Sequence, residues 1–387
     1  MKKLFGVSLM SAMLIFGQPF MALADTTGPR TINFEDIESI IAEQNINVQI
    51  NQNERLKGKV SSADLKRTIK ELEDDLEDIK DERGEASDLS EIITLNAEKR
   101  GLLEALKQVE RGIVDLPTAL AIIDLQASMS DDYQTLSAES NFIKYNQSNL
   151  DLEDIARSID STQDQLTNLQ LQESLGMVSS NNLNAIRTML VDLQTKLEST
   201  KLVQDSYERQ LKDLLNEQEN SLVIGSIPSV DEDFIVKDTD ADLKAALENN
   251  YNIKIQEQQI VMLQSALESA KKDHGMSSQE YKEADYDLAN ANLKLTQAKE
   301  SLKTSYYTMI DDISKLQSAL KLADQNLEDQ KVALSEAQIR MGLGMISKLE
   351  MDDANNIYQV KENAVKAMRI NLFNAKCNYE WFLKGLS

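Results

Sequence analysis

The sequence predicts an all-α protein made of elongated antiparallel coiled-coil hairpins in two tandem repeats. With 4 Pro, 13 Gly and 5% aromatic residues among 387, the chain is poor in sheet-forming residues and suited to long helices. Apolar residues recur at alternating spacings of three and four over long stretches, which is typical of coiled coils. The two halves of the chain also resemble each other, and this internal similarity indicates a duplicated helical unit.

Residues 1–24 are predicted to be a secretory signal peptide. They combine two lysines at the start, an apolar stretch over residues 4–16 and an Ala22-Leu23-Ala24 cleavage site. The apolar stretch is too short to cross a bilayer core of about 30 Å, which disfavours the alternative of a short membrane anchor. We therefore expect an exported protein of the cell envelope, located in the outer membrane, in the periplasm or at the cell surface.

The most regular heptad pattern predicts one very long helix from about Tyr281 to Arg340. Its length would be roughly 90 Å at 1.5 Å per residue. The apolar or small residues of this seam are Leu288, Ala291, Leu295, Ala298, Leu302, Tyr306, Met309, Ile313, Leu316, Leu320, Ala323 and Leu327. Shorter seams cover residues 65–79 and 183–214. Because a narrow apolar stripe on a lone helix is not stable in water, these seams must pair with one another.

Two breaks predict the turns of the hairpins. Gly176 can end a helix in a left-handed conformation, and Ser180 can cap the helix that follows. Gly342 and Gly344 end a second helix. Ser347 then offers an N-cap, with a glutamate three residues later in the pattern of a capping box.

A third break, with Gly225 and Pro228, indicates an extended linker between the repeats. The predicted organisation is a signal peptide (1–24), a first helical hairpin repeat (25–220), the linker (221–238) and a second helical hairpin repeat (239–387).

The duplication is visible in two pairs of segments. Residues 33–50 match residues 239–256: each has a polar cap, an acidic and apolar helix, a Gln-Asn or Asn-Asn pair and then a new helix. Residues 175–194 match residues 343–362 when a shift of register is allowed. The sequence therefore predicts two copies of one long helical hairpin.

These features resemble the TolC-type outer-membrane efflux proteins over about residues 33–387. Members of that family open each repeat with a short helix, similar to residues 242–250 here (DLKAALENN), and carry a glycine with apolar residues at each hairpin tip. In that family three chains form a hollow cylinder of antiparallel helices, and the tips face an adaptor protein joined to an inner-membrane pump. The resemblance therefore implies a TolC-like α-barrel protomer and a homotrimer.

The resemblance also implies adaptor docking through the two tips. The tip residues are Leu175, Gly176, Met177, Met341, Gly342 and Leu343. Small exposed apolar clusters with polar rims mark interfaces, which agrees with this interpretation. The alternative is that these apolar residues belong to helix caps and pack back on their own hairpins.

The chain departs from the family where members insert a pair of barrel strands into each repeat. In the second repeat only residues 273–278 interrupt the helical pattern, and they predict a helix–turn–helix. In the first repeat the pattern is again helical, with a break expected near Gly112 and Pro117. We therefore find no evident β-barrel. Because no apolar run after residue 24 looks long enough for a membrane helix, we expect membrane association through assembly rather than a transmembrane helix.

The family often constricts its pore with acidic residues just past the second tip. The corresponding places here hold Lys348 and, after a shift of register, Asp352 and Asp353. The alternative is a solvated acidic first turn, which the helix dipole favours.

The sequence carries no pattern of catalysis, cofactor binding or metal binding. His274 is the only histidine, and it has no nearby Cys with which to hold zinc. Phosphate-loop, nucleophile-elbow and zinc-protease motifs are absent. A formal net charge of −24 disfavours nucleic acid as a partner. We expect neither an enzyme nor a cofactor.

The function expected from this pattern is that of a passive exit-duct component in an envelope efflux or secretion system. Its partners would be two sister chains, a periplasmic-type adaptor and an inner-membrane pump that supplies the energy. The alternative is a secreted structural coiled-coil envelope protein without transport activity.

Overall fold

The computed structural model describes residues 30–217, 222–228, 234, 236 and 238–387, so the predicted signal peptide lies outside the described residues. Helices dominate the described chain, as the sequence predicted. They are a short 3-10 helix η1 (Phe34–Asp36), α1 (Ile37–Gln44), α2 (Ile46–Glu85), α3 (Leu89–Ser174), α4 (Ser180–Leu215), α5 (Thr239–Asn249), α6 (Tyr251–His274), α7 (Gln279–Gly342) and α8 (Lys348–Lys384).

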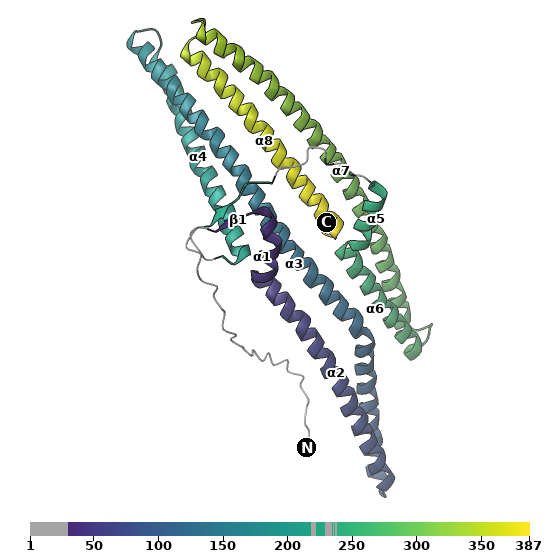
Figure 1. The fold of residues 1–387 in the computed structure, drawn as a ribbon. Coiled ribbons are helices and arrows are strands. Elements are labelled where there is room, and N and C mark those ends of the chain that lie inside the picture. The colour runs from purple at the N-terminus through teal and green to yellow at the C-terminus, as the bar shows by residue number, and fades with distance from the viewer. Residues whose placement is uncertain (1–29, 218–221, 229–233, 235, 237) are drawn as a thin grey trace.

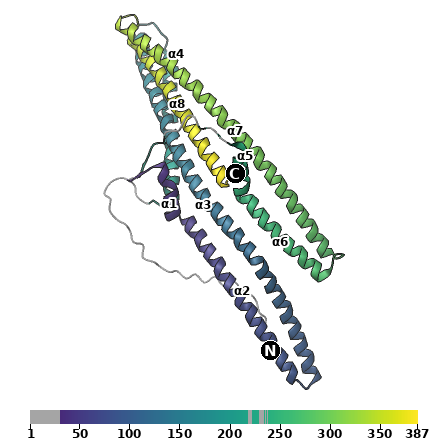
Figure 2. The same ribbon diagram turned by 45° about the vertical axis from the view of Figure 1, so that its right-hand side comes forward.

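Long antiparallel helices give the protein its elongated shape (Figures 1 and 2). Helix α3 packs against α2 and α6 on one side of the middle of the molecule and against α4 and α8 on the other. Helix α7 runs beside α6 and then beside α8. The turns between α3 and α4 and between α7 and α8 lie at the same end of the molecule (Figure 1).

The core lies at the middle of the molecule, where the short helices α1 and α5 cover the long ones. One cluster centres on Phe142 and Leu211 and includes the isoleucines of α1. A second centres on Tyr306 and Leu372 and includes residues of α5 and α6. Between them, Ile143 of α3 packs with residues of α8 and so joins the two halves of the chain. Burial is therefore concentrated where both halves meet.

A two-stranded parallel sheet fastens the start of the described chain to the region before α5. Strand β1 (Thr31–Ile32) pairs with β2 (Val223–Ile224). The backbone N–H of Gly225 donates to the carbonyl of Ile32 over 2.8 Å. A Cβ atom at position 225 would lie 3.0 Å from that carbonyl oxygen, so glycine suits this close approach. The strand falls inside the predicted linker, much of which lies outside the described residues.

One predicted break is wrong. Helix α3 continues through Gly112 and Pro117 from Leu89 to Ser174. A proline costs a helix one backbone hydrogen bond, but here α2 packs alongside and holds α3 in place. The Leu120 side chain of α3 lies over Gly58 of α2, where an added Cβ would approach it to 2.8 Å. The tertiary contact therefore outweighs the local preference.

Two other predictions are confirmed. The long heptad helix is α7, whose bounds lie two residues outside the expected ones at each end. The interruption before it is a helix–turn–helix, since α6 ends at His274 and α7 begins at Gln279.

An asparagine has the same role at the start of α2 and at the start of α6. Asn45 donates from Nδ2 to the carbonyl of Leu214, near the end of α4, over 2.7 Å. Asn250 donates from Nδ2 to the carbonyl of Gly385, at the end of α8, over 3.2 Å. Each side chain also accepts from backbone N–H groups of the helix that it begins. One residue type therefore joins the entry of one long helix to the end of another in both halves.

Candidate functional site: the hairpin tips and the open flanks

The two hairpin tips are copies of one turn. Residues 175–179 read Leu-Gly-Met-Val-Ser and residues 343–347 read Leu-Gly-Met-Ile-Ser. Gly176 has φ +71° and Gly344 has φ +69°, the left-handed conformation that ends many helices. The N–H of Met177 donates to the carbonyl five residues earlier over 2.9 Å, and the N–H of Met345 does the same over 2.8 Å. Both tips are therefore Schellman turns, in which only glycine takes the central position without strain.

This geometry changes the residue assignment at the second tip. Gly342 is the last residue of α7, whereas Gly344 makes the turn. The segment equivalent to residues 175–177 is therefore 343–345, two residues beyond the trio Met341-Gly342-Leu343. The two tips align without a shift of register. The helix after the first tip is capped at Ser179, one residue before the predicted cap.

The apolar side chains of both tips are exposed. Leu175, Met177, Leu343 and Met345 have between 65% and 71% of their surface accessible. Met341 is less exposed, at 38%. These side chains do not pack back on their own hairpins within the single chain. Figure 1 places both tips at one end of the molecule, and each tip carries its own exposed apolar side chains.

The helix after the second tip begins with the predicted capping box. The Ser347 hydroxyl accepts from the backbone N–H of Glu350 over 3.2 Å, and the Glu350 carboxylate accepts from the backbone N–H of Ser347 over 2.8 Å. The backbone hydrogen bond, followed by the one from the hydroxyl, lowers the pKa of Glu350 below its usual value. This reciprocal pair holds the tip at a defined angle to α8.

The three residues considered for a constriction lie on the first two turns of α8. Lys348 and Asp353 are exposed and Asp352 is partly buried. None of them forms an ion pair with any residue in the described ranges. They are near the tip along the helix, but a single chain does not define which face would line a lumen.

The two lateral edges of the folded chain are open. Helix α7 packs mainly against α5, α6 and α8, and no helix in the described part of the chain covers its other side. At the opposite edge, α4 and α2 contact mainly α3 and the short helix α1. An edge made by α7 and an edge made by α2 with α4 therefore have no neighbouring helix among the residues that the structure describes.

These edges carry exposed apolar residues. On α7 they are Tyr286, Leu293, Tyr307, Leu322, Val332 and Ile339. At 100° per residue these positions fall within about 100° of one another, so they form one stripe. The stripe is about 80 Å long at 1.5 Å per residue. At the other edge the exposed apolar residues are Ile46, Ile50, Leu56 and Val60 of α2 and Met189, Val191, Leu202 and Val203 of α4.

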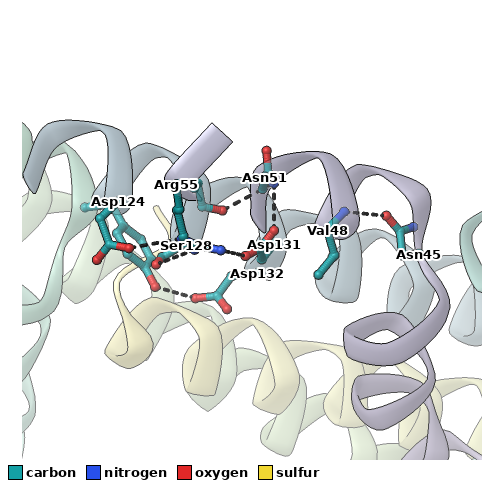
Figure 3. Close-up of polar contacts among 10 residues, drawn as sticks. Asn45, Val48, Asn51, Arg55, Asp124, Ser128, Asp131 and Asp132 are labelled. Atoms are coloured by element: carbon teal, nitrogen blue, oxygen red, sulfur yellow. Dashed lines mark hydrogen bonds and ion pairs between the residues drawn. The ribbon is translucent and has the colours of Figure 1, made fainter. Parts of the chain in front are cut away.

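A polar cluster joins helices α2, α3 and α6 (Figure 3). Arg55 of α2 donates to the carboxylates of Asp124 and Asp131 on α3, each over 3.0 Å. The next residue, Asp132, accepts from the hydroxyl of Tyr251 on α6 over 2.7 Å. Burial raises the pKa of Asp132 above its usual value, and the Tyr251 hydrogen bond opposes this rise. Every carboxylate here has a partner, so the cluster binds α2, α3 and α6 together.

A second buried contact joins α3 to α8. The indole N–H of Trp381 donates to the carboxylate of Glu139 over 2.6 Å. Burial raises the pKa of Glu139, and the Trp381 hydrogen bond opposes this rise. Lys384 lies over the Trp381 ring and pairs with Glu38 of α1 at 3.7 Å. Sequence reasoning missed this contact, because residues so far apart in the chain leave no local pattern.

The sequence expectation about membrane helices needs one correction. Helix α3 contains an 18-residue stretch with a mean hydropathy of 1.2, and 6% of that stretch is buried within the chain. By length and composition alone this stretch could cross a membrane. Within the described ranges no group of three or more His, Cys, Asp or Glu side chains could hold a metal ion.

Comparisons with known proteins agree with this architecture. No protein-family model matches the chain, and no curated protein matches its sequence. The outer-membrane channel OprN superposes with a TM-score of 0.64 at 10% identity, over 91% of this chain and 90% of OprN. CusC, whose structures concern transmembrane channel formation, superposes with a TM-score of 0.61 at 9% identity, over 96% of this chain and 99% of CusC. The protein has the TolC-type fold.

A third structure extends this comparison. The Campylobacter jejuni outer membrane channel CmeC superposes on this chain with a TM-score of 0.56 at 10% identity, over 72% of this chain and 68% of CmeC. At this level of identity the comparison shows the fold. Of the three structures, CmeC and OprN are named as outer-membrane channels. Among the described residues of this chain, strands are confined to β1 and β2.

Proposed function

We propose that the protein is a passive exit-duct component of an envelope efflux or secretion system. Three copies would form a helical channel that docks to a pump adaptor through the hairpin tips. The observation that carries this proposal is the pair of open edges on an elongated protomer. The TolC-type fold, shared with proteins named as outer-membrane channels, supports it.

The open edges suggest how the copies associate. The α7 edge of one copy would pack against the α2 and α4 edge of the next copy. Such head-to-tail contacts use two different surfaces and close into a ring when the rotation between copies allows it. Because each long helix has a narrow apolar stripe, burial of the α7 stripe would add a between-chain seam to the within-chain ones. The wall of the duct would therefore consist of helices from all three copies.

The tips would be the docking surface. Leu175, Met177, Leu343 and Met345 form small apolar surfaces at the end of each hairpin, and such surfaces are typical of contacts with a partner. The partner would be a periplasmic-type adaptor joined to an inner-membrane pump. Lys348, Asp352 and Asp353 would line a constriction behind the tips, where three copies of each would approach one another.

The remaining features fit a passive component. The sequence contains no phosphate-binding loop, so a partner would supply the energy. The strongly acidic chain would repel nucleic acid. With the predicted signal peptide removed, the protein would work in the cell envelope without a catalytic role or a cofactor.

Native mass spectrometry of the mature protein tests the assembly. We expect a trimer for the wild type and a monomer for the double variant Leu293→Glu with Leu322→Glu, which places charges on the α7 stripe. Ser301→Glu, at an exposed position on α7 outside the stripe, should remain a trimer. A wild type that is monomeric at working concentration would contradict the duct. It would favour the structural coiled-coil alternative.

A binding assay tests the docking surface. The double variant Met177→Ser with Leu343→Ser should lose adaptor binding while its circular dichroism and its oligomeric state stay unchanged. Because Met276 is an exposed methionine in the turn between α6 and α7, Met276→Ser is a matched control that should bind normally. Unchanged adaptor binding by the double variant would contradict docking through the tips.

A further inference from the structure

The end of the protein opposite the tips is asymmetric. Both views show the hairpin of α2 and α3 reaching beyond the turn between α6 and α7 (Figures 1 and 2). Asp273, at the end of α6, accepts from Lys107 of α3 at 2.6 Å and also pairs with Arg111. This ion pair marks the level at which the second half of the chain ends. Residues 70–107 run from this level to the end of the hairpin and back, and we name them the projecting arm.

Helix α3 has two apolar faces in the projecting arm. One face packs on α2, as the buried side chain of Leu95 shows. The other face carries Leu89, Ile93 and Leu103, with exposed fractions from 47% to 72%. At 100° per residue these three positions, together with Val114 just above the arm, fall within about 80°. They form an apolar stripe that no element among the described residues covers.

Helix α2 cannot provide an apolar cover for that stripe. Between residue 61 and its end at residue 85 it exposes no large apolar side chain. Residues 70–85 contain nine acidic and three basic residues, whereas residues 89–107 of α3 contain three of each. Of the nine acids, Glu71 alone forms an ion pair with a described residue, Arg67. The α2 face is therefore strongly negative, while the α3 face is close to neutral.

We propose that the projecting arms of neighbouring copies pack against each other through the α3 stripes, with the acidic α2 faces directed away from the contact. Two α3 faces can approach because neither carries a net charge, whereas two α2 faces would repel each other. A lipid bilayer fits less well, because the α2 charges are costly in hydrocarbon and repel anionic headgroups. This contact rests on the proposed assembly of several copies and would join them by helices at the end opposite the tips.

Disulfide crosslinking between variants with one introduced cysteine tests the contact. In a ring whose rotation axis runs beside the arms, the α3 stripes of neighbouring copies meet at that axis with equivalent positions together, so Leu103→Cys should give a crosslinked dimer on a non-reducing gel after mild oxidation. Asp78→Cys, on the exposed acidic face of α2, should not crosslink. The native Cys377 is buried and does not compete. Adding Ile93→Glu to Leu103→Cys should abolish the crosslinked band.

Native mass spectrometry of the same samples separates this contact from the overall assembly. A trimer in which Leu103→Cys does not crosslink would overturn the arm contact and leave the proposed duct intact. A monomer would overturn both. Flotation with phosphatidylcholine vesicles tests whether a lipid bilayer covers the α3 stripe instead. If the vesicles protect the L103C thiol from a soluble maleimide and the trimer forms no crosslink, the stripe is a lipid-binding surface and the proposal is wrong.

Discussion

Replacing Asn250 by Ala should destabilise the protein by about 2 to 3 kcal/mol. The side chain is 3% exposed and begins α6, where its Oδ1 accepts from the backbone N–H of Ile253 over 3.0 Å. Loss of such an N-cap costs about 1 kcal/mol. Its Nδ2 donates to the carbonyl of Gly385, and loss of a buried hydrogen bond of this kind costs about 1 to 2 kcal/mol more.

Urea unfolding followed by circular dichroism measures this loss, with the protein concentration held constant because assembly shifts apparent stability. Asn45→Ala should lose a similar amount, since Asn45 makes the equivalent contacts in the first half of the chain. The control is Asn355→Ala, an exposed position inside α8, which should change stability by less than about 0.5 kcal/mol. An Asn250→Ala variant as stable as this control would show that Asn250 does not hold the start of α6 to the end of α8.

Three further outcomes follow from the turn and from two titrating groups. Gly344→Ala should lower the free energy of unfolding by about 1 to 2 kcal/mol, because φ at this residue is +69°. Gly342→Ala lies inside the helix, so it should leave stability unchanged or raise it. Urea unfolding measures both variants, and equal effects would contradict the turn assignment. Burial raises the pKa of Glu139 above 4.5, so the folded chain binds the carboxyl proton more tightly than the unfolded chain does. The stability of the fold therefore falls as pH rises through the raised pKa. Glu139→Gln keeps an acceptor for Trp381 and should flatten the dependence of the melting temperature on pH; an unchanged profile would contradict this. The pKa of Glu350 is lowered from 4.5, so its contribution is present above 4.5 and is lost as pH falls through the lowered pKa. A spin label at Lys348→Cys should therefore gain mobility in acid, and it should not do so when Glu350→Gln is added.

The long helices could be predicted because their heptad patterns are local. Helix α7 follows its seam to within two residues at each end, and the turn after His274 is where the pattern stops. The duplication was also readable, since the asparagines at positions 45 and 250 occur in matching segments and make matching contacts. Local pattern and tertiary packing agree in these elements.

The errors occurred where packing or a precise backbone angle decides the outcome. Pro117 predicts a break by its own chemistry, but contacts with α2 keep α3 continuous. Gly342 and Gly344 are both good helix ends, and only the backbone angle identifies Gly344 as the turn residue. The matching segments Leu-Gly-Met-Val-Ser and Leu-Gly-Met-Ile-Ser were the available signal. The contact of Glu139 with Trp381 joins residues that lie 242 positions apart. The periodicity of a single sequence cannot predict a contact between such distant residues.

The buried Cys377 has a practical consequence for labelling experiments. Burial, followed by the nearby Glu139, raises the pKa of its thiol to about 12, so it stays protonated at neutral pH. The thiolate is the reactive form, and this side chain is 6% exposed. The wild-type thiol should therefore not react with fluorophores or spin labels that are directed to newly introduced surface cysteines. Distances between copies can thus be measured without altering the core.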